Sequence, residues 1–208
     1  MFLYYNISNY LLNEQGYNMN YQKISTALLL LTSSIIPQHA SATDEQMLKQ
    51  EAMDIVKQFG GTLKPQLVKA MKEGGPVHAI DICATQAPKI AKQLSKKTGW
   101  EVKRVSLKMR NTNTATPDVW ERGILEEFDV KQASGTKAGK LTASIVQDGK
   151  FRFMKAQGAQ PVCLTCHGTN IKPKVQEALN KHFPKDLATG YTLGQVRGAF
   201  SLSKILEE

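Results

Sequence analysis

Residues 141–153 read LTASIVQDGKFRF, in which apolar and polar residues alternate on both sides of Asp148-Gly149. Alternation places the apolar side chains on one face of a strand, and Asp-Gly between two alternating runs is a strong signal for a tight hairpin turn. The stretch therefore predicts an antiparallel β-hairpin.

The residues before this hairpin carry a helical pattern. Apolar positions recur at helical spacing in residues 44–73, but Gly60-Gly61 interrupts them, which predicts two helices joined by a turn. A third helix is expected to begin after Gly75 and to carry Cys83 on its apolar face, so that this thiol points toward the core. The first half of the domain is therefore predicted to be largely helical.

Strands and helices follow one another in the rest of the chain. Residues 100–109 alternate between apolar and basic side chains and predict a half-buried strand. Asp118 is expected to cap a short helix, residues 173–183 predict a further helix, and residues 196–202 predict a final strand. This order of elements predicts an α+β domain with an antiparallel sheet.

The first 42 residues of the 208-residue chain have the features of segments that are removed after synthesis. Residues 1–18 contain no basic residue and are interpreted as an extension upstream of the true start codon. Residues 19–42 carry Lys23, an apolar run and a terminal Ala-Ser-Ala, which is typical of a signal peptide; an uncleaved amphipathic anchor is the alternative. No later segment approaches the ~20 apolar residues of a membrane span. We therefore expect a periplasmic protein with a single domain over residues 43–208.

The segment Cys163-Leu164-Thr165-Cys166-His167 has the C-x-x-C-H arrangement of c-type haem attachment. Two thiols separated by two residues can reach both vinyl groups on one edge of a porphyrin, and the adjacent histidine then lies beneath the iron. Thioether attachment keeps that histidine at a very high effective concentration. The sequence therefore predicts one covalent haem c, with Cys163 and Cys166 forming the thioethers and His167 as the proximal iron ligand.

Three other interpretations of the motif fit less well. A disulfide between Cys163 and Cys166 would suit an oxidising compartment but gives His167 no role. A thioredoxin-like redox pair is expected after a strand and at a helix N-terminus, whereas Pro161 precedes this motif and Gly168 follows it. A structural zinc site needs a second pair of ligands at metal-ligand spacing, which the sequence lacks.

The second axial position of the iron has several candidate ligands. They are Cys83, Met109, Met154, His78 and His182. With two thiols bound to haem, Cys83 is left unpaired in an exported protein, and a role as iron ligand would explain it. Pro88 lacks an N–H group and is expected to bend the helix close to Cys83. A buried, inert cysteine is the alternative, and the residues alone leave both open.

The formal net charge is +9, and many of the basic residues concentrate in one stretch. This stretch contains Lys92, Lys96, Lys97, Lys103, Arg104, Lys108 and Arg110. It could steer an acidic partner or offset haem propionates, and a solvated basic face is the alternative. Arg104, Arg110 and Arg197 are candidates for pairing with propionates. Nucleic acid is disfavoured as a partner because of the export signal.

Several segments along the chain form a set that is specific when taken together. They are residues 79–83 (AIDIC), 98–100 (TGW), 105–111 (VSLKMRN), 117–121 (PDVWE), 151–155 (FRFMK), 163–168 (CLTCHG), 188–191 (ATGY) and 197–201 (RGAFS). The set resembles a family of exported single-haem c-type domains, once catalogued as a domain of unknown function, which occur alone or as the sensor part of signalling kinases. The resemblance implies a PAS-like fold with haem against the antiparallel sheet, and iron held between His167 and Cys83.

Two functions follow from this interpretation. A thiolate ligand from Cys83 would stabilise ferric iron and lower the reduction potential, which suits a low-potential electron carrier with an acidic redox partner. The alternative is a haem-based redox or gas sensor for nitric oxide or carbon monoxide that acts through a separate partner. The chain carries no transmitter domain, which favours the carrier. We do not expect an enzyme, because a peroxidase needs an open iron and a distal acid–base group.

Overall fold

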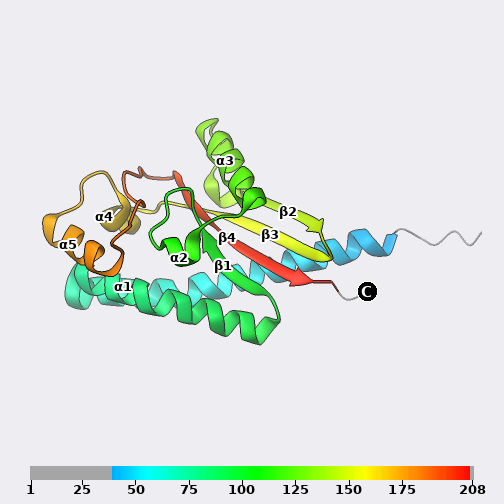
Figure 1. Cartoon of the computed structure of the whole chain (residues 1–208), viewed down its shortest axis with the longest axis horizontal. Helices are drawn as coiled ribbons and strands as arrows, with labels where there is room; N and C mark the ends of the chain where they lie inside the picture. The colour runs from blue at the N-terminus through cyan, green and yellow to red at the C-terminus, as the bar shows by residue number, and fades with distance from the viewer. Residues whose placement is uncertain (1–38, 207–208) are drawn as a thin grey trace, which may run out of the picture. The chain divides into compact units, whose positions relative to one another are not determined.

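The computed structural model describes the backbone of residues 39–206 and the side chains from residue 44 onward. The predictions for residues 1–18, and for residues 19–38 of the signal segment, lie outside the described residues. The described residues 39–206 belong to one compact unit. Its elements, shown in Figure 1, are α1 (His39–Thr98), β1 (Glu101–Val105), α2 (Thr112–Ala115), α3 (Val119–Ala133), η1 (Ala138–Lys140), β2 (Thr142–Gln147), β3 (Lys150–Gly158), η2 (Pro161–Cys163), α4 (Leu164–His167), α5 (Pro173–His182) and β4 (Val196–Ile205).

The sheet has four strands in the order β1-β4-β3-β2, and every neighbouring pair is antiparallel. The predicted hairpin is confirmed as β2 and β3. Asp148 (φ 51°) and Gly149 (φ 67°) both adopt left-handed backbone angles, as a type I′ turn requires. The predicted α+β class with an antiparallel sheet is likewise confirmed.

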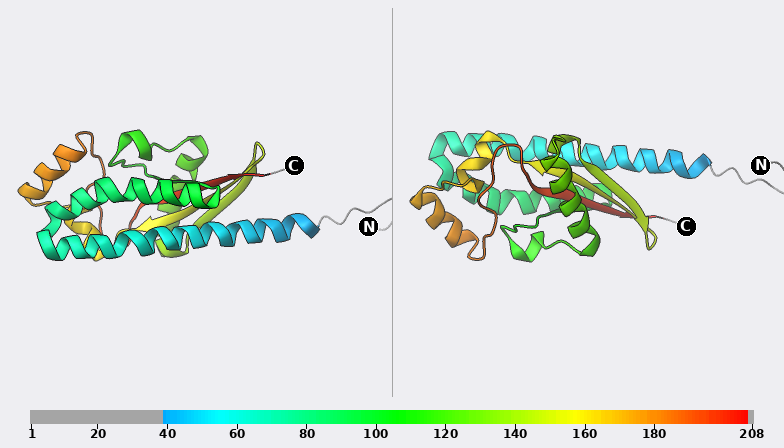
Figure 2. Two further views of the ribbon diagram at one scale, coloured as in Figure 1. Left: turned by 90° about the horizontal axis from the view of Figure 1, so that it is seen from below. Right: turned by 90° about the horizontal axis from the view of Figure 1, so that it is seen from above.

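Helices cover both faces of this sheet. The two halves of α1 run side by side across one face, and α3 lies on the other (Figures 1 and 2). The core on the α1 face includes Ile55, Phe59, Trp100, Phe151, Phe153, Phe200 and Leu202. The core on the α3 face includes Val105, Leu125, Phe128, Met154 and Ala156. Strands β1, β3 and β4 thus contribute side chains to both cores.

The predicted break at Gly60-Gly61 is wrong, because α1 continues through both glycines and changes direction at Gly75 instead. Gly75 has φ 69° and ψ −165°, which ends one helical segment and starts the next. Two interior glycines cost about 1 kcal/mol each. Burial of Phe59 against the sheet contributes about 2 kcal/mol and helps to offset that cost. The backbone angles stay helical through Pro88, so the helix is not interrupted beside Cys83.

The strand predicted for residues 100–109 is shorter in the structure, because β1 ends at Val105. The Ser106 N–H then donates to the carbonyl of Ala115 at 3.1 Å, and the short helix α2 occupies the connection. Asp118 caps α3 as predicted. Its carboxylate accepts from the Glu121 N–H at 2.9 Å, and the Glu121 carboxylate accepts from the Asp118 N–H at 2.9 Å.

The remaining helix and strand predictions are confirmed by α5 and β4. Among the helices within residues 39–206, none combines the length and apolar character that crossing a membrane requires.

Candidate functional site

The Cys163–His167 motif occupies two single-turn helices, η2 and α4, that follow β3. The turn ends at Gly168, whose N–H donates to the Leu164 carbonyl at 2.9 Å. A Cβ atom at position 168 would lie 2.5 Å from that carbonyl oxygen. Only glycine lets the chain leave the turn so closely, and the motif residues remain partly buried.

All three cysteines of the chain are free thiols, and the structure gathers them in one region. Burial raises the pKa of the Cys83 thiol, and the neighbouring Cys163 raises it further. Burial also raises the pKa of Cys166, to which Cys83 and Cys163 again contribute. Such electrostatic effects act over short distances. Cys166 packs against Ile80, about one helical turn before Cys83. The fold therefore brings Cys83 to the motif.

The imidazole of His167 is held in one tautomer. Its Nδ1–H donates to the Ala188 carbonyl at 2.7 Å, and because a carbonyl oxygen only accepts, the proton must lie on Nδ1. The lone pair is then on Nε2. Burial, together with the positive charges of Arg197 and Arg110, lowers the pKa of His167 to about 2. His167 is therefore a neutral imidazole with a free Nε2 lone pair, the form that ligates metals.

Arg110 holds the motif against the loop before Tyr191. Its side chain donates to Asp186 Oδ1 at 3.2 Å, to the Ala188 carbonyl at 3.2 Å, and to the Cys166 carbonyl. Asp186 Oδ1 also accepts from the Ala188 N–H at 2.8 Å. Arg110 thus has a carboxylate partner within the protein, so it positions the motif and is not a free cation for a propionate. Sequence reasoning missed Asp186, since nothing marks it except its place two residues before the ATGY segment.

The loop ending at Tyr191 completes the support of His167. The Tyr191 N–H donates to the His167 carbonyl at 2.9 Å, and the Gly190 N–H donates to the Gly168 carbonyl at 2.9 Å. The buried Tyr191 ring meets the imidazole edge-on, with centroids 6.3 Å apart. Lys108 Nζ lies 5.1 Å from the centroid of the same ring. The ATGY segment therefore supports the imidazole through its backbone and its aromatic ring.

Two further arginines lie beside the thiols and the imidazole. One Arg197 guanidinium nitrogen lies 3.4 Å from His167 Nε2, while Arg197 Nε is buried without a hydrogen-bond partner. The Arg104 guanidinium lies 5.6 Å from the centroid of the Phe200 ring. Burial and the charge of Arg197 lower the pKa of Arg104 to about 9. The structure thus places two of the three predicted propionate candidates in the site, and neither has a carboxylate partner in the part of the chain that the structure describes.

The other axial candidates are engaged elsewhere or lie at the surface. Met154 is completely buried in the core on the α3 face. The Met109 sulfur accepts from a threonine hydroxyl at 3.2 Å. His182 Nε2 lies 2.6 Å from Asp81 Oδ1, which joins the end of α5 to α1. His78 is exposed on α1. Of the five candidates, Cys83 is the one that the fold places among the motif residues.

The basic stretch predicted as a single surface is divided by the fold. Lys92, Lys96 and Lys97 are exposed on α1. Lys103 points to the α3 side, where its Nζ lies 3.0 Å from Glu121. Arg104, Lys108 and Arg110 lie beside the motif and the Tyr191 loop. The basic residues of this stretch therefore do not form one outer face, because some of them lie beside the motif and one pairs with a buried carboxylate.

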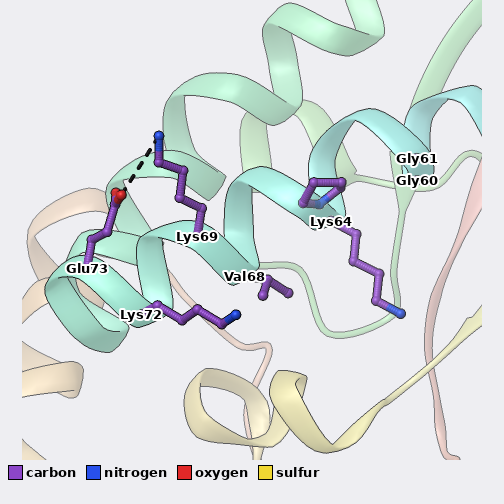
Figure 3. A pocket seen from close by; sticks show the side chains of 8 residues that line it. Gly60, Gly61, Lys64, Val68, Lys69, Lys72 and Glu73 are labelled. Carbon is purple, nitrogen blue, oxygen red and sulfur yellow. Dashed lines mark ion pairs between the residues drawn. The ribbon is translucent and has the colours of Figure 1, made fainter.

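A groove of about 820 Å³ lies along the first half of α1 (Figure 3). It is lined by Gly60, Gly61, Lys64, Pro65, Val68, Lys69, Lys72 and Glu73, and by none of the cysteines. Lys64, Val68 and Lys72 point to the same side of the helix, whereas Lys69 pairs with Glu73 at 3.8 Å. The groove is therefore a basic surface feature distinct from the motif.

The alternative interpretations of the motif gain no support from the structure. Cys163 and Cys166 are free thiols. Within residues 44–206, no group of three or more His, Cys, Asp or Glu side chains is arranged to hold a bare metal ion. The arrangement instead presents two neighbouring thiols, a third thiol from α1, and an imidazole with an oriented lone pair.

Comparisons with known proteins point to one family. The structure resembles the crystal structure of the cyanobacterial heme-protein Tll0287, with a TM-score of 0.57 and 23% sequence identity, over 76% of this chain and 97% of that chain. No curated protein matches the chain. The model of the Tll0287-like family matches residues 29–204. Since this match spans most of the sequence, the protein belongs to the Tll0287-like family.

Proposed function

We propose that this protein is an exported c-type haem protein in which Cys163 and Cys166 form thioethers to one haem and His167 ligates the iron through Nε2. The observation that carries the proposal is the orientation of His167. Its Nδ1–H is committed to the Ala188 carbonyl, so the Nε2 lone pair is available beside two free thiols. The similar cyanobacterial protein is named as a heme-protein, which supports the same conclusion.

The residues present fit a covalent haem. Thiols and an imidazole are its usual protein partners, and Gly168 lets the motif turn end abruptly after the histidine. Arg110 and the Tyr191 loop fix the position of His167 before any ligand binds. Bound haem supplies a one-electron ferric/ferrous couple. The protein's own contribution is to hold the imidazole as a neutral base and to shield it from water.

Cys83 is the proposed second axial ligand. The fold places it beside the motif, whereas the other candidates lie in a separate core, in other contacts or at the surface. Burial raises the pKa of Cys83, and the charges of Arg104 and Arg197 oppose that effect. Thiolate ligation would place the reduction potential low, which suits a periplasmic electron carrier and not an enzyme.

An acidic protein is the proposed redox partner of this carrier. The net charge of +9 favours association with acidic surfaces. The groove on α1 supplies a docking surface of matching chemistry, with Lys64 and Lys72 on either side of Val68. Raising the salt concentration should therefore slow electron transfer to the partner.

A sensor of carbon monoxide or nitric oxide is the second candidate function. Such a gas can bind only if it displaces Cys83 from the iron, so this function requires a labile iron–sulfur bond. Adding carbon monoxide to the ferrous protein separates the two functions. A prompt shift of the Soret band supports a displaceable ligand and a sensor, whereas an unchanged band supports the carrier.

Expression with haem-maturation machinery tests the attachment. The mature wild-type protein should gain the mass of one haem and keep it through acid-acetone extraction. Cys163→Ala and Cys166→Ala together should leave the haem extractable, while Thr165→Ala, which leaves both cysteines intact, should behave as wild type. Wild-type protein with the mass of the bare polypeptide and no Soret band would contradict the proposal.

Electron paramagnetic resonance of the ferric protein tests the axial pair. A low-spin signal with the g-values of histidine/thiolate ligation is expected, and Cys83→Ala should abolish it and raise the reduction potential. An unchanged spectrum in Cys83→Ala would transfer the role to another residue. His78→Ala, on the exposed face of the same helix, is the matched control.

A further inference from the structure

Arg104 and Arg197 form a pair of cations to which no carboxylate is paired within residues 44–206. Their charges interact strongly enough to shift the pKa of Arg104 downward. Cys83 and Cys163 act in the opposite direction on the pKa of Arg104, which places both cysteines close to it. The Nε atom of Arg197 is buried without a hydrogen-bond partner. Partly buried like charges close to one another are costly unless anions accompany them.

The backbone fixes both arginines at the end of the β1–β4 ladder. Arg104 pairs with Phe200 across the ladder, and Val105 pairs with Ala199. Beyond that pair, Gly198 has φ 142°, and a Cβ atom there would lie 2.5 Å from the Val105 carbonyl. The close approach that glycine permits draws the two strands together at the point where Arg104 and Arg197 lie. The pair is therefore built into the sheet and does not depend on a mobile loop.

We infer that Arg104 and Arg197 bind the two propionate carboxylates of the haem and hold them inside the protein. This inference rests on the proposed function, because it requires a haem at the Cys163–His167 motif. Guanidinium groups suit this task, since their planar N–H forks match carboxylates in bidentate fashion. Two carboxylates would neutralise the two cations.

The contact between Arg197 and His167 supports the same assignment. Arg197 donates toward Nε2 at 3.4 Å, yet Nε2 is the atom that must ligate iron. A ligating nitrogen has no lone pair left to accept that hydrogen bond. Arg197 then needs another acceptor, and a propionate is the anion that accompanies the iron. Arg110 does not need one, because Asp186 Oδ2 lies 3.1 Å from its guanidinium.

Carboxylate labelling of the haem peptide provides the test. The segment between Lys155 and Lys174 contains no Asp or Glu, so trypsin should release the haem on residues 156–174 with the propionates as its only carboxylates at the time of labelling. The mature holoprotein is treated with a carbodiimide and glycinamide before digestion, and the peptide mass counts the propionates that formed amides. Propionates held by buried guanidiniums should resist labelling.

The variants Arg104→Gln and Arg197→Gln should each raise the labelling rate by at least about tenfold, which corresponds to about 1.4 kcal/mol of lost protection. Arg104→Lys and Arg197→Lys keep the positive charge and should retain most of the protection from labelling. If a glutamine variant does not acquire haem, the corresponding lysine variant is compared with the wild type instead. Arg152→Gln removes an arginine of similar burial on the α3 side and should label as wild type.

Two results would overturn the inference alone. One is a wild-type holoprotein whose propionates label as fast as those of a haem peptide released by digestion beforehand. The other is a wild-type level of protection in both glutamine variants. A wild-type protein without covalent haem would instead overturn the proposed function, and the mass spectrum distinguishes this failure from the other two.

Discussion

Basic side chains cluster on both sides of the sheet, and the two clusters differ in the anion that accompanies them. On the α3 side, Glu121 is fully buried, with its carboxylate 3.0 Å from Lys103 Nζ and 3.5 Å from Arg152. The Ser201 hydroxyl also donates to it at 2.6 Å. Beside the motif, neither Arg104 nor Arg197 is paired with a carboxylate among the described residues.

The charges of the α3 cluster are therefore balanced within the protein, whereas those beside the motif are expected to need a bound anion. Every oxygen of Glu121 has a partner from the protein, so the α3 cluster stabilises the fold and gives no reason to expect an added group. The cluster beside the motif concentrates positive charge around an uncharged imidazole and free thiols. An electrostatic imbalance in a partly buried site is a physical indicator of function.

Glu121→Gln removes the anion of the α3 cluster and should have the largest effect on stability. It leaves Lys103 and Arg152 without their shared buried anion, and we expect a loss of about 3 kcal/mol in the free energy of unfolding. Urea unfolding of the holoprotein measures this loss. Glu126→Gln, at an exposed position of the same helix, is the control, and an equally small change in both variants would contradict the expectation.

Acid should destabilise the haem-free protein through His167, which lies beside Arg197. The double variant Cys163→Ala, Cys166→Ala supplies this haem-free protein. The folded-state pKa of His167 is lowered from 6.5 to about 2, so below pH 6.5 the unfolded chain binds a proton that the folded chain does not. Stability should therefore fall as the pH decreases, by about 2 kcal/mol between pH 7 and pH 5. Urea unfolding at both pH values measures the change. Adding His167→Gln should remove most of this dependence, and an unaltered dependence would refute the assignment to His167.

Asp186→Asn tests the one arginine beside the motif that already has a carboxylate. Both side chains of the Arg110–Asp186 pair are largely buried, and the loss should be about 2 kcal/mol in unfolding free energy. The electron paramagnetic resonance signal should also broaden, because the carbonyl that orients His167 is less firmly held. Asp54→Asn, in an exposed helical pair with Lys57, should do neither, and sharp signals in both variants would argue against the positioning role.

His182→Ala should have the smallest effect. Its pair with Asp81 is partly exposed, and such pairs contribute about 0.5 kcal/mol. Thermal unfolding should change little, and the ferric spectrum should be that of the wild type. A changed spectrum would identify His182 as an iron ligand and would contradict the assignment of Cys83 to that position.

Local chemistry explains which features could be predicted from the sequence. The hairpin follows from Asp148-Gly149, because the backbone angles of a type I′ turn depend on those two residues. The cap of α3 follows from Asp118 and Glu121, which lie three residues apart. The break in α1 was predicted at the wrong place, because the helix around Gly60-Gly61 is stabilised by packing of Phe59 against the sheet. That sheet is formed by residues much later in the chain.

The sequence by itself determined the pattern of the sheet and the spacing of Cys163, Cys166 and His167, since both depend on residues only a few positions apart. Only the tertiary structure decided that Cys83 would join them, that Ala188 would fix the tautomer of His167, and that Arg104 and Arg197 would lack a carboxylate. The physical reason is range. Hydrogen bonds and electrostatic interactions act between groups that are close in space, and residues far apart in the chain become close only when the helices and the sheet have packed.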